Sequence, residues 1–403
     1  MSIPTGNRKL IRAINSSHVL NTIKTHRQVG RAEIARRTGL SPATVTSITS
    51  VLISQRLVLE KSAGDSNGGR PPILLAINPQ GGYVVGIKLT EEHAVCVLAD
   101  LEATVVVKSS TALSGHDPES VVGDLAQMVS VLIRKQGVPK KKLLGVGIGL
   151  AGIVDADQGI LRQSPIYGWQ NVPLRAMLQG KLHIPVYIEN DVNTLTMTEK
   201  WFGHGQGLDN FLTVTVGRGV GMGILVNGQF YRGQGGGAGE LGHTVINPDG
   251  PMCECGKRGC LETYVGDPGL VRLAKEAALS GKLSGAVQDV SELLALARDG
   301  NEAAEQIFAR SGRILGLGIA NLVSLFNPQK IIISGEGTRA GDFLFEPMKE
   351  SIQQNTMPGL FNPDTVQIAP WGDDAWARGA AGLVLREVFE SPIHKKTPVS
   401  ELA

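Results

Sequence analysis

The segment GELGH at residues 239–243 is followed, ten residues after its histidine, by CECGKRGCLE at residues 253–262. The second segment holds three cysteines in a C-x-C-x4-C run, and its glycines allow a loop to turn around an ion. Zinc binds thiolates and imidazoles at tetrahedral corners, so this pattern predicts a structural Zn²⁺ site. The alternative is a glycine-rich loop in which the cysteines occur by chance. The predicted ligands are His243, Cys253, Cys255 and Cys260.

The composition is that of a globular protein. Among 403 residues, 42% are hydrophobic and 19% are charged, which suits a chain of two or three domains. The chain has four cysteines, three of them in this run, and no secretory signal at its start. We therefore expect a cytoplasmic protein rather than a disulfide framework. No apolar run is long enough to cross a bilayer, so membrane insertion is not expected.

Charge is distributed unevenly along the chain. Residues 1–75 contain eleven Lys and Arg against three acidic residues, a net charge of +8, whereas the whole chain carries +2. A basic head on an acidic body is typical of a module that binds a polyanion and is fused to a second function.

This head has the pattern of a winged helix-turn-helix, which is an all-α unit with a small β wing. Apolar residues at helical spacing predict a helix over 11–23, and a second helix is predicted over 31–38, ended by Gly39. Ser41 and Pro42 suit the N-cap and the first turn of a third helix, which would enter the major groove of DNA. The predicted buried face of this third helix comprises Val45, Ile48, Val51 and Leu52.

Small and hydroxylated side chains near the start of the third helix can approach base edges, and arginines nearby can contact phosphates. The predicted DNA contacts are Arg31, Arg36, Arg37, Ser41, Pro42, Ala43, Thr44, Thr46, Ser47 and, in the wing, Arg70. Arg70 belongs to the segment NGGRP at 67–71, which is either a minor-groove hook or a plain linker. For the whole head, the alternative is a docking module whose arginines are only solvated.

From residue 83 onward, predicted strands alternate with helices. This alternation predicts an α/β architecture with mostly parallel central strands. The halves that begin at residues 83 and 211 start alike, which favours a duplicated fold with a cleft between two lobes. The strands are predicted at 83–89, 94–98, 104–108, 144–150, 186–189, 211–216 and 330–333, with a helix at 118–136.

The body resembles the ROK family of repressors and sugar kinases in GELGH, CECGKRGCLE, ENDVN at 189–193, and the glycine series from 217 to 223. The resemblance runs from about residue 83 to about residue 389 and implies an actin-like, hexokinase-like fold of two lobes. With the head included, the chain resembles the transcriptional-repressor branch of the family. The implied domains are the winged helix-turn-helix at 1–76, lobe 1 at 77–191 completed by a helix around 374–389, lobe 2 at 192–373 with the zinc site and a dimerisation surface, and a polar tail at 390–403.

The resemblance also implies a sugar site. In kinases of the family, the residue matching Asp191 is the general base for a sugar hydroxyl, and in a repressor it would be a vestigial base that only binds. Family residues that contact sugar hydroxyls match Asn190, Glu240, His243 and Glu262, whose polar groups suit hydroxyls. One ring nitrogen of His243 would bind zinc while the other donates to the sugar. For Asn190 and Asp191, the alternative is an N-cap pair that opens the next helix.

The phosphate loop departs from the family pattern. Family kinases have DxGGTK after the first strand of the body, whereas this chain has Lys88-Leu89-Thr90-Glu91-Glu92-His93. The glycines that admit ATP phosphates are absent and two carboxylates take their place, so we predict that ATP binding and enzyme activity are lost. In the second glycine loop, Arg218 either holds an anion or forms a structural ion pair, and we expect the ion pair. The glycines of residues 334–337 match a nucleotide-proximal loop of the family. We expect that they are kept only because the turn after the strand requires glycine.

A further departure affects the choice of sugar. Family sugar binders often have a sugar-contacting Asn after Ser-Pro in the loop that leads to Gly-Trp, whereas this chain has SPIYGW at 164–169. One hydroxyl contact is therefore lost. Tyr167 in this loop either stacks on a sugar face or packs internally.

Together these features predict a repressor whose affinity for a pseudo-palindromic operator changes when a monosaccharide binds between the lobes. We expect a homodimer or a dimer of dimers, with contacts from a helix at 303–325. The first alternative is an ATP-dependent hexose kinase with a fused DNA-binding head. The second is a repressor controlled by a protein partner from a sugar-uptake system.

Overall fold

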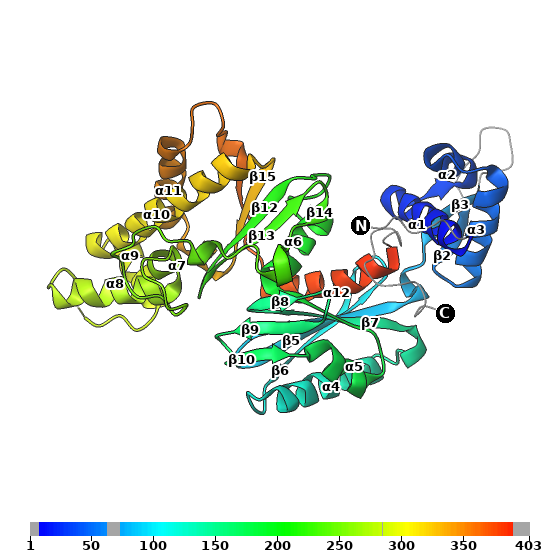
Figure 1. Ribbon diagram of the computed structural model, residues 1–403, viewed down its shortest axis with the longest axis horizontal. Coiled ribbons are helices and arrows are strands. Elements are labelled where there is room, and N and C mark those ends of the chain that lie inside the picture. The colour runs from blue at the N-terminus through cyan, green and yellow to red at the C-terminus, as the bar shows by residue number, and fades with distance from the viewer. Residues whose placement is uncertain (1–7, 63–72, 284, 390–403) are drawn as a thin grey trace.

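The computed structural model describes residues 8–62, 73–283 and 285–389, which form a small head and a two-lobed α/β body (Figure 1). The head contains three helices and a small antiparallel sheet in the order β1-β3-β2. The tip of the wing, with Arg70 and the NGGRP segment, lies outside the described residues, as does the tail at 390–403. The head elements are α1 (Arg8–His26), β1 (Val29–Gly30), α2 (Arg31–Thr38), α3 (Pro42–Ser54), β2 (Val58–Ser62) and β3 (Ile73–Ile77).

Local signals place the turn between α2 and α3 as predicted. Gly39 caps α2 in the left-handed conformation with φ of 71°, which glycine adopts without steric cost. Ser41 caps α3, because its side-chain oxygen accepts a hydrogen bond of 3.2 Å from the backbone N–H of Thr44. The predicted buried face of α3 needs one correction: Val51 is only half-buried, and Thr49 is fully buried in its place. Thr49 can enter the core because its hydroxyl is hydrogen-bonded.

Lobe 1 contains a five-stranded sheet in the order β11-β7-β4-β5-β6, with β4, β7 and β11 parallel and the other neighbours antiparallel. Helices α4 and α5 pack on one face, and α12 packs on the other. The predicted strand at 104–108 continues to residue 112, because side chains there alternate between the sheet and solvent. The elements are β4 (Tyr83–Leu89), β5 (His93–Asp100), β6 (Val105–Ala112), α4 (Pro118–Lys135), β7 (Leu143–Leu150), α5 (Leu174–Leu182), β11 (Val186–Asn190) and α12 (Asp373–Phe389).

A short antiparallel meander, which the sequence pattern did not predict, follows β7 and lies beside the cleft. It has the order β10-β9-β8. Its strands are β8 (Ile153–Asp155), β9 (Ile160–Ser164) and β10 (Trp169–Val172).

Lobe 2 contains a second five-stranded sheet, in the order β14-β13-β12-β15-β16. Its helices pack their apolar faces on this sheet and on one another to form a separate core. The elements are β12 (Phe211–Val216), β13 (Val220–Val226), β14 (Gln229–Phe230), α7 (Glu262–Val265), α8 (Asp267–Leu279), α9 (Val290–Arg298), α10 (Glu302–Phe326), β15 (Lys330–Ser334), α11 (Asp342–Asn355) and β16 (Val366–Ile368).

Helix α6 (Asp191–Phe202) packs on the lobe 2 sheet and against α12, so this pair of helices joins the two lobes. Glycine makes their close approach possible: a side-chain carbon at Gly379 of α12 would collide with the backbone oxygen of Thr194 on α6. The arrangement confirms the two-lobed α/β body with a helix-turn-helix head. Within the described residues, no helix has the length and apolar character needed to span a membrane.

Candidate functional site

A cluster of one imidazole and three thiols lies at the edge of lobe 2. His243 ends a short 3-10 helix (Leu241–His243), and the three cysteines lie on the loop that precedes α7. Their potential ligand atoms all lie within 4.8 Å of one another. The structure thus brings together all four residues of the predicted metal site: His243, Cys253, Cys255 and Cys260.

The spacing of these atoms fits a tetrahedral zinc site. Cys253 Sγ lies 3.5 Å from His243 Nδ1, and Cys255 Sγ lies 3.6 Å from Cys260 Sγ. With Zn–S bonds of about 2.3 Å and Zn–N bonds of about 2.0 Å, tetrahedral edges measure about 3.5 Å for N···S and about 3.8 Å for S···S. These two separations therefore match those of a tetrahedral site, and the four residues suit Zn²⁺.

Gly259 and Lys257 fix the conformation of the loop that carries the three cysteines. Gly259 has φ of 66°, and a side chain there would collide with the backbone of Asn247. The ammonium group of Lys257 donates a hydrogen bond of 2.7 Å to the backbone oxygen of His243. Since Cys253 and Cys260 are buried and Cys255 is exposed, the cluster is reached from solvent on one side.

The imidazole of His243 links this cluster to the cleft between the lobes. Its Nδ1 atom faces the cysteines, while its Nε2 atom lies 3.9 Å from Glu240 Oε2. Glu262 approaches the same ring, with Oε1 4.0 Å from Nδ1. The ring is therefore placed so that one nitrogen can bind a metal and the other can donate to a ligand.

The cleft has a volume of about 1040 Å³ and is lined from both lobes. Polar groups converge in it from the start of α6, the 3-10 helix and the start of α7. The five predicted sugar contacts all line it, namely Asn190, Asp191, Glu240, His243 and Glu262.

Asn190 is the N-cap of α6, as the alternative reading proposed. Its side-chain oxygen accepts hydrogen bonds from the backbone N–H groups of Val192 and Asn193, at 2.9 and 3.3 Å. Its amide nitrogen donates to the backbone oxygen of Gly152 at 3.1 Å. Asp191 is the first residue of the helix and not a cap. The amide of Asn190 therefore has a structural role, which leaves one N–H available to a ligand.

The carboxylates of the cleft differ in their surroundings. Burial raises the pKa of Asp191, and the positive charge of Lys88 partly offsets this rise. Burial also raises the pKa of Glu240, against the opposing effect of His243. Glu262 is held in place because its Oε2 atom accepts a hydrogen bond of 2.9 Å from the backbone N–H of Val220.

A tight hairpin joins β4 to β5 at the segment Lys88-Leu89-Thr90-Glu91-Glu92-His93. The hydroxyl of Thr90 donates to the backbone oxygen of His93 at 2.8 Å, which closes the turn between β4 and β5. Lys88 is buried, with its ammonium group 3.9 Å from Glu336 Oε1 and 4.5 Å from the centroid of the Trp376 ring. The side chain of Lys88 thus reaches from lobe 1 to the glycine loop at residues 334–337 of lobe 2.

Arg218 forms the ion pair that its sequence context predicts. Its guanidinium lies 3.9 Å from the carboxylate of Glu91. This pair also joins the hairpin of lobe 1 to a glycine loop of lobe 2. Both partners are about half exposed, so the energy of this single pair is small.

Tyr167 packs internally, which decides between its two predicted roles. Its hydroxyl donates a hydrogen bond of 2.9 Å to the backbone oxygen of Leu89, and its ring lies 4.9 Å from that of Trp169. Burial raises the pKa of this phenol. A hydroxyl engaged in this way fixes the loop at 164–169 beside the cleft.

One contact between the lobes was missed by sequence reasoning. Glu189, only 2% exposed, accepts a hydrogen bond of 2.6 Å from Arg232 Nε across the lobes. The same carboxylate accepts one of 3.0 Å from the side chain of Asn193. A charged residue at the end of the otherwise apolar strand 186–189 was the available signal, since buried charges require partners.

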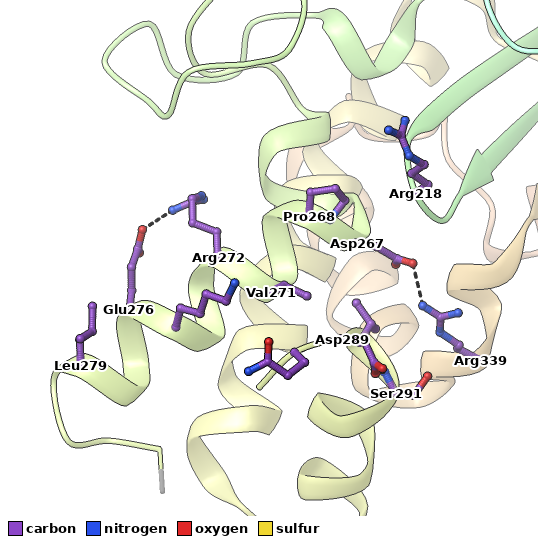
Figure 2. Close-up of a pocket in the computed structure, with 13 residues that line it drawn as sticks. Arg218, Asp267, Pro268, Val271, Arg272, Glu276, Leu279, Asp289, Ser291 and Arg339 are labelled. Atoms are coloured by element: carbon purple, nitrogen blue, oxygen red, sulfur yellow. Dashed lines mark hydrogen bonds and ion pairs between the residues drawn. The ribbon is translucent and has the colours of Figure 1, made fainter. Parts of the chain in front are cut away.

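A second pocket, of about 810 Å³, lies between α8, α9 and the loop before α11 (Figure 2). Its side chains pair with one another: Arg339 lies 2.7 Å from Asp267, and Arg272 lies 2.5 Å from Glu276. Arg218 and Arg272 also line the interlobe cleft, so the two hollows adjoin. These ion pairs compensate much of the charge inside the pocket.

In the head, the predicted recognition helix presents its polar side to solvent. Ser41, Pro42, Ala43, Thr46 and Ser47 are exposed, and Thr44 is half-buried. The hydroxyl of Thr46 donates to the backbone oxygen of Pro42 at 2.9 Å and keeps acceptor sites free for a ligand.

The predicted phosphate contacts have partners within the head. Arg31 joins Glu60 of β2 at 2.6 Å and donates to Thr49 at 3.2 Å, which ties α2 to the wing and to α3. Arg36 and Arg37 share the carboxylate of Glu33 at 2.6 and 2.5 Å. Arg31 thus has a structural role in addition to its charge, whereas Arg36 and Arg37 stay on the surface.

Comparison with known proteins agrees with this architecture. The sequence profile of the ROK family matches residues 84–387, and that of the IclR helix-turn-helix domain matches residues 14–61. A protein named xylose repressor from Caldicellulosiruptor bescii is 31% identical over 395 residues, which cover 96% of this chain and 99% of the relative.

Two solved structures share the fold. A ROK family transcriptional regulator, described as a homologue of an Escherichia coli protein, superimposes with a TM-score of 0.84 at 27% identity and covers 95% of this chain and 98% of its own. A ROK family glucokinase from Streptomyces griseus, solved with glucose and AMPPNP, gives a TM-score of 0.64 at 30% identity and covers 75% and 99%. With its helix-turn-helix head and its two-lobed body, the chain belongs to the ROK family.

Proposed function

We propose that this protein is a DNA-binding transcriptional repressor that responds to a monosaccharide. The observation that carries the proposal is the combination of a helix-turn-helix head with a polar cleft, lined from both lobes, in one chain. The relative named xylose repressor and the ROK transcriptional regulator match the chain over nearly its full length, head included. The glucokinase covers only the body.

The sugar binds between the lobes in this proposal. Asn190 and Asp191 reach it from the junction of β11 and α6, while Glu240, His243 and Glu262 reach it from lobe 2. A ligand held from both sides favours the closed arrangement of the lobes. It changes operator affinity only to the extent that it binds one arrangement more tightly than the other.

A structural Zn²⁺ ion is the metal that we propose for the Cys3His cluster. It would be held by His243 and the three cysteines, and when bound it supplies a fixed tetrahedral centre rather than chemistry. The protein residues then orient the ligand: His243 keeps its Nε2 atom toward the cleft, beside Glu240. Sugar recognition and metal binding would thus share one side chain.

We further propose that the cleft does not phosphorylate the sugar. Lys88 and Glu91 extend from lobe 1 to Glu336 and Arg218 at the glycine loops of lobe 2. Two carboxylates in this region oppose a triphosphate. Asp191 would then only accept hydrogen bonds from a sugar hydroxyl.

The proposal includes an assembly that suits a pseudo-palindromic operator. A homodimer, or a dimer of dimers, would pair two heads. Leu325 and Met357, on the α10 and α11 side of lobe 2, have exposed fractions of 78% and 70% and are candidate contacts. The domain division at 1–76, 77–191 with 374–389, and 192–373 belongs to the same proposal, as do cytoplasmic location and contact with a protein of a sugar-uptake system.

A thermal-shift screen against monosaccharides and their phosphates tests the proposal. A ligand that binds only the folded state raises the melting temperature, and the rise grows with the logarithm of its concentration relative to its Kd. Each hit is then added to the protein bound to a DNA duplex that the protein itself has selected from a random pool. We expect at least one sugar to stabilise the protein and to change its DNA affinity. The proposal fails if hits leave DNA binding unchanged.

A further inference from the structure

An aromatic and cationic contact joins the head to the body. The ammonium group of Lys24, on α1, lies 3.4 Å from the centroid of the Trp201 ring and 4.5 Å from that of Phe389. Trp201 belongs to α6 and Phe389 to α12. One side chain of the DNA-binding head therefore touches both helices that join the two lobes.

Hydrogen bonds fix α1 to only one of these helices. Ser17 and Asn21 of α1 each donate a hydrogen bond of 2.7 Å to the backbone oxygen of Phe389. The apolar core of the head also continues into the face of lobe 1 that α12 covers. The head is thus anchored to α12, and the Lys24 contact with Trp201 adds a link to α6, whose Trp201 and Phe202 also pack against the shared core.

Because Lys24 is half-buried, the energy of its contact with Trp201 depends on the position of the ring. Removal from water lowers the pKa of Lys24 to about 8. A buried ammonium group gains from the face of an aromatic ring, most of all from tryptophan. Displacement of the Trp201 ring would leave this charge poorly compensated, so the position of α6 affects the stability of the junction.

Both helices run from the sugar cleft to this junction. Helix α6 begins with Asp191, which lines the cleft, and carries Trp201 near its other end. Helix α12 carries Trp376, which also lines the cleft, near its start and ends at Phe389. In Figure 1, α12 extends in red from the middle of the molecule toward the blue head.

The contact between the helices has the form of a pivot. Helix α12 is seated on the lobe 1 sheet, because side chains at Gly86 or Gly147 would collide with its backbone. Helix α6 contacts α12 where Thr194 faces Gly379 and where the hydroxyl of Thr198 donates a hydrogen bond of 2.7 Å to the backbone oxygen of Ala375. At a rise of about 1.5 Å per residue, Asp191 and Trp201 each lie about 4.5 Å beyond these contacts, on opposite sides. A tilt of α6 about these contacts therefore moves Trp201 as well as Asp191.

We propose that the contact of Lys24 with Trp201 transmits sugar binding to the DNA-binding head. This inference rests on the proposed function. A sugar that draws lobe 2 toward lobe 1 tilts α6 on α12, and the tilt shifts Trp201 against a lysine whose helix is held by Phe389. The head then changes from one orientation on the body to another. Coupling between distant sites requires such a part with two states, each favoured by one ligand.

The test measures sugar binding and its effect on DNA separately. D-xylose, D-glucose and N-acetyl-D-glucosamine are the probes, with titration calorimetry for sugar affinity. Fluorescence anisotropy of the selected duplex gives DNA affinity with and without saturating sugar. Lys24→Met keeps the length and apolar packing of the side chain, and Lys24→Arg keeps the charge. We expect Lys24→Met to reduce the effect of sugar on DNA affinity by about fivefold or more, within the usual range of coupling factors.

The sugar affinity of Lys24→Met should stay within about twofold of that of the natural protein. Lys24→Arg should retain most of the effect of sugar on DNA affinity. Trp201→Leu removes the aromatic ring on α6 and leaves Lys24 in place. It should reduce the effect of sugar on DNA affinity to the same extent, and it provides the test if Lys24→Met does not fold. An unchanged response in Lys24→Met or in Trp201→Leu overturns the inference, as does an equal loss of sugar binding. If the natural protein itself binds none of the probes or shows no response, the proposed function fails first.

Discussion

Glu189 and Arg232 form a buried ion pair across the lobes, with Arg232 Nε 2.6 Å from Glu189 Oε2. Glu189 is the penultimate residue of β11, directly before Asn190, and Arg232 lies in the loop that leads to Glu240. The pair therefore joins the two segments that carry the proposed sugar contacts. Because Glu189 is almost inaccessible, its charge depends on this partner.

Arg232→Met should destabilise the protein by about 3–5 kcal/mol, because it leaves a buried carboxylate without its counter-charge. Chemical denaturation followed by circular dichroism measures the change in the free energy of unfolding. The double variant Glu189→Gln, Arg232→Met removes the charge as well and should recover a large part of the loss. Equal stability of the single and double variants would show that the charge on Glu189 is not the cause.

Asp191→Asn should abolish the response to sugar and raise thermal stability. The pKa of Asp191 is raised in the folded protein, so the folded state holds a proton more readily than the unfolded chain. Stability is therefore gained as the pH falls through this raised pKa, and the ionised group costs stability at neutral pH. An increase in melting temperature of about 2 °C or more is expected at pH 7. An unaltered sugar affinity would remove Asp191 from the site.

Cys255→Ser should weaken both metal binding and sugar binding. It replaces one thiolate of the cluster, so the zinc content measured by mass spectrometry should fall from about one ion per chain, and the melting temperature should drop by about 5 °C or more. Sugar affinity should fall because His243 loses its fixed position. Cys96→Ala is the control, since Cys96 is buried in the lobe 1 sheet away from the cluster. Zinc loss with intact sugar binding would separate the two functions.

Ser47→Ala should weaken DNA binding without affecting the fold. The side chain is exposed on α3, and the loss of one base or phosphate contact corresponds to about 1–2 kcal/mol, or about 5- to 30-fold in affinity. Ser50→Ala is the matched control, one turn further along the same helix and also exposed. If both variants bind the selected duplex equally well, α3 does not present this face to DNA.

The natural protein should not transfer phosphate from ATP to a hexose. A coupled assay with ATP, Mg²⁺ and the three sugar probes should give no turnover, because the carboxylates of Glu91 and Glu336 lie beside the cleft where phosphates would enter. Turnover that disappears in Asp191→Asn would instead establish the kinase alternative.

Sequence reasoning succeeded where the determinants are local. The bounds of α2 at 31–38 and the cap at Gly39 follow from a few neighbouring residues, and the structure has them as predicted. The four residues of the metal cluster also lie within 18 positions of one another, so their spacing alone indicated that they meet. Strands such as 83–89 and 211–216 could be predicted because both of their faces are buried, which makes their sequences continuously apolar.

The remainder depends on contacts between distant segments. Lys88 and Glu336 are far apart in the chain, and nothing near either residue indicates that they lie 3.9 Å apart. Tyr167 had two physically reasonable roles, and only the position of Leu89 decides that it packs internally. From the sequence, Thr49 is expected on the surface of α3. Its burial depends on a hydrogen bond from Arg31, which lies on another helix and reaches Thr49 only in the folded protein.

The pairing of Lys88 with Glu336 has a consequence for how a cell would use the protein. In the S. griseus glucokinase structure, a sugar and a nucleotide analogue are both bound. Here, side chains of the protein itself bridge the corresponding edges of the lobes. In the proposed repressor, a single bound molecule would then suffice to close the cleft. The signal would follow the supply of sugar alone, whatever the energy charge of the cytoplasm.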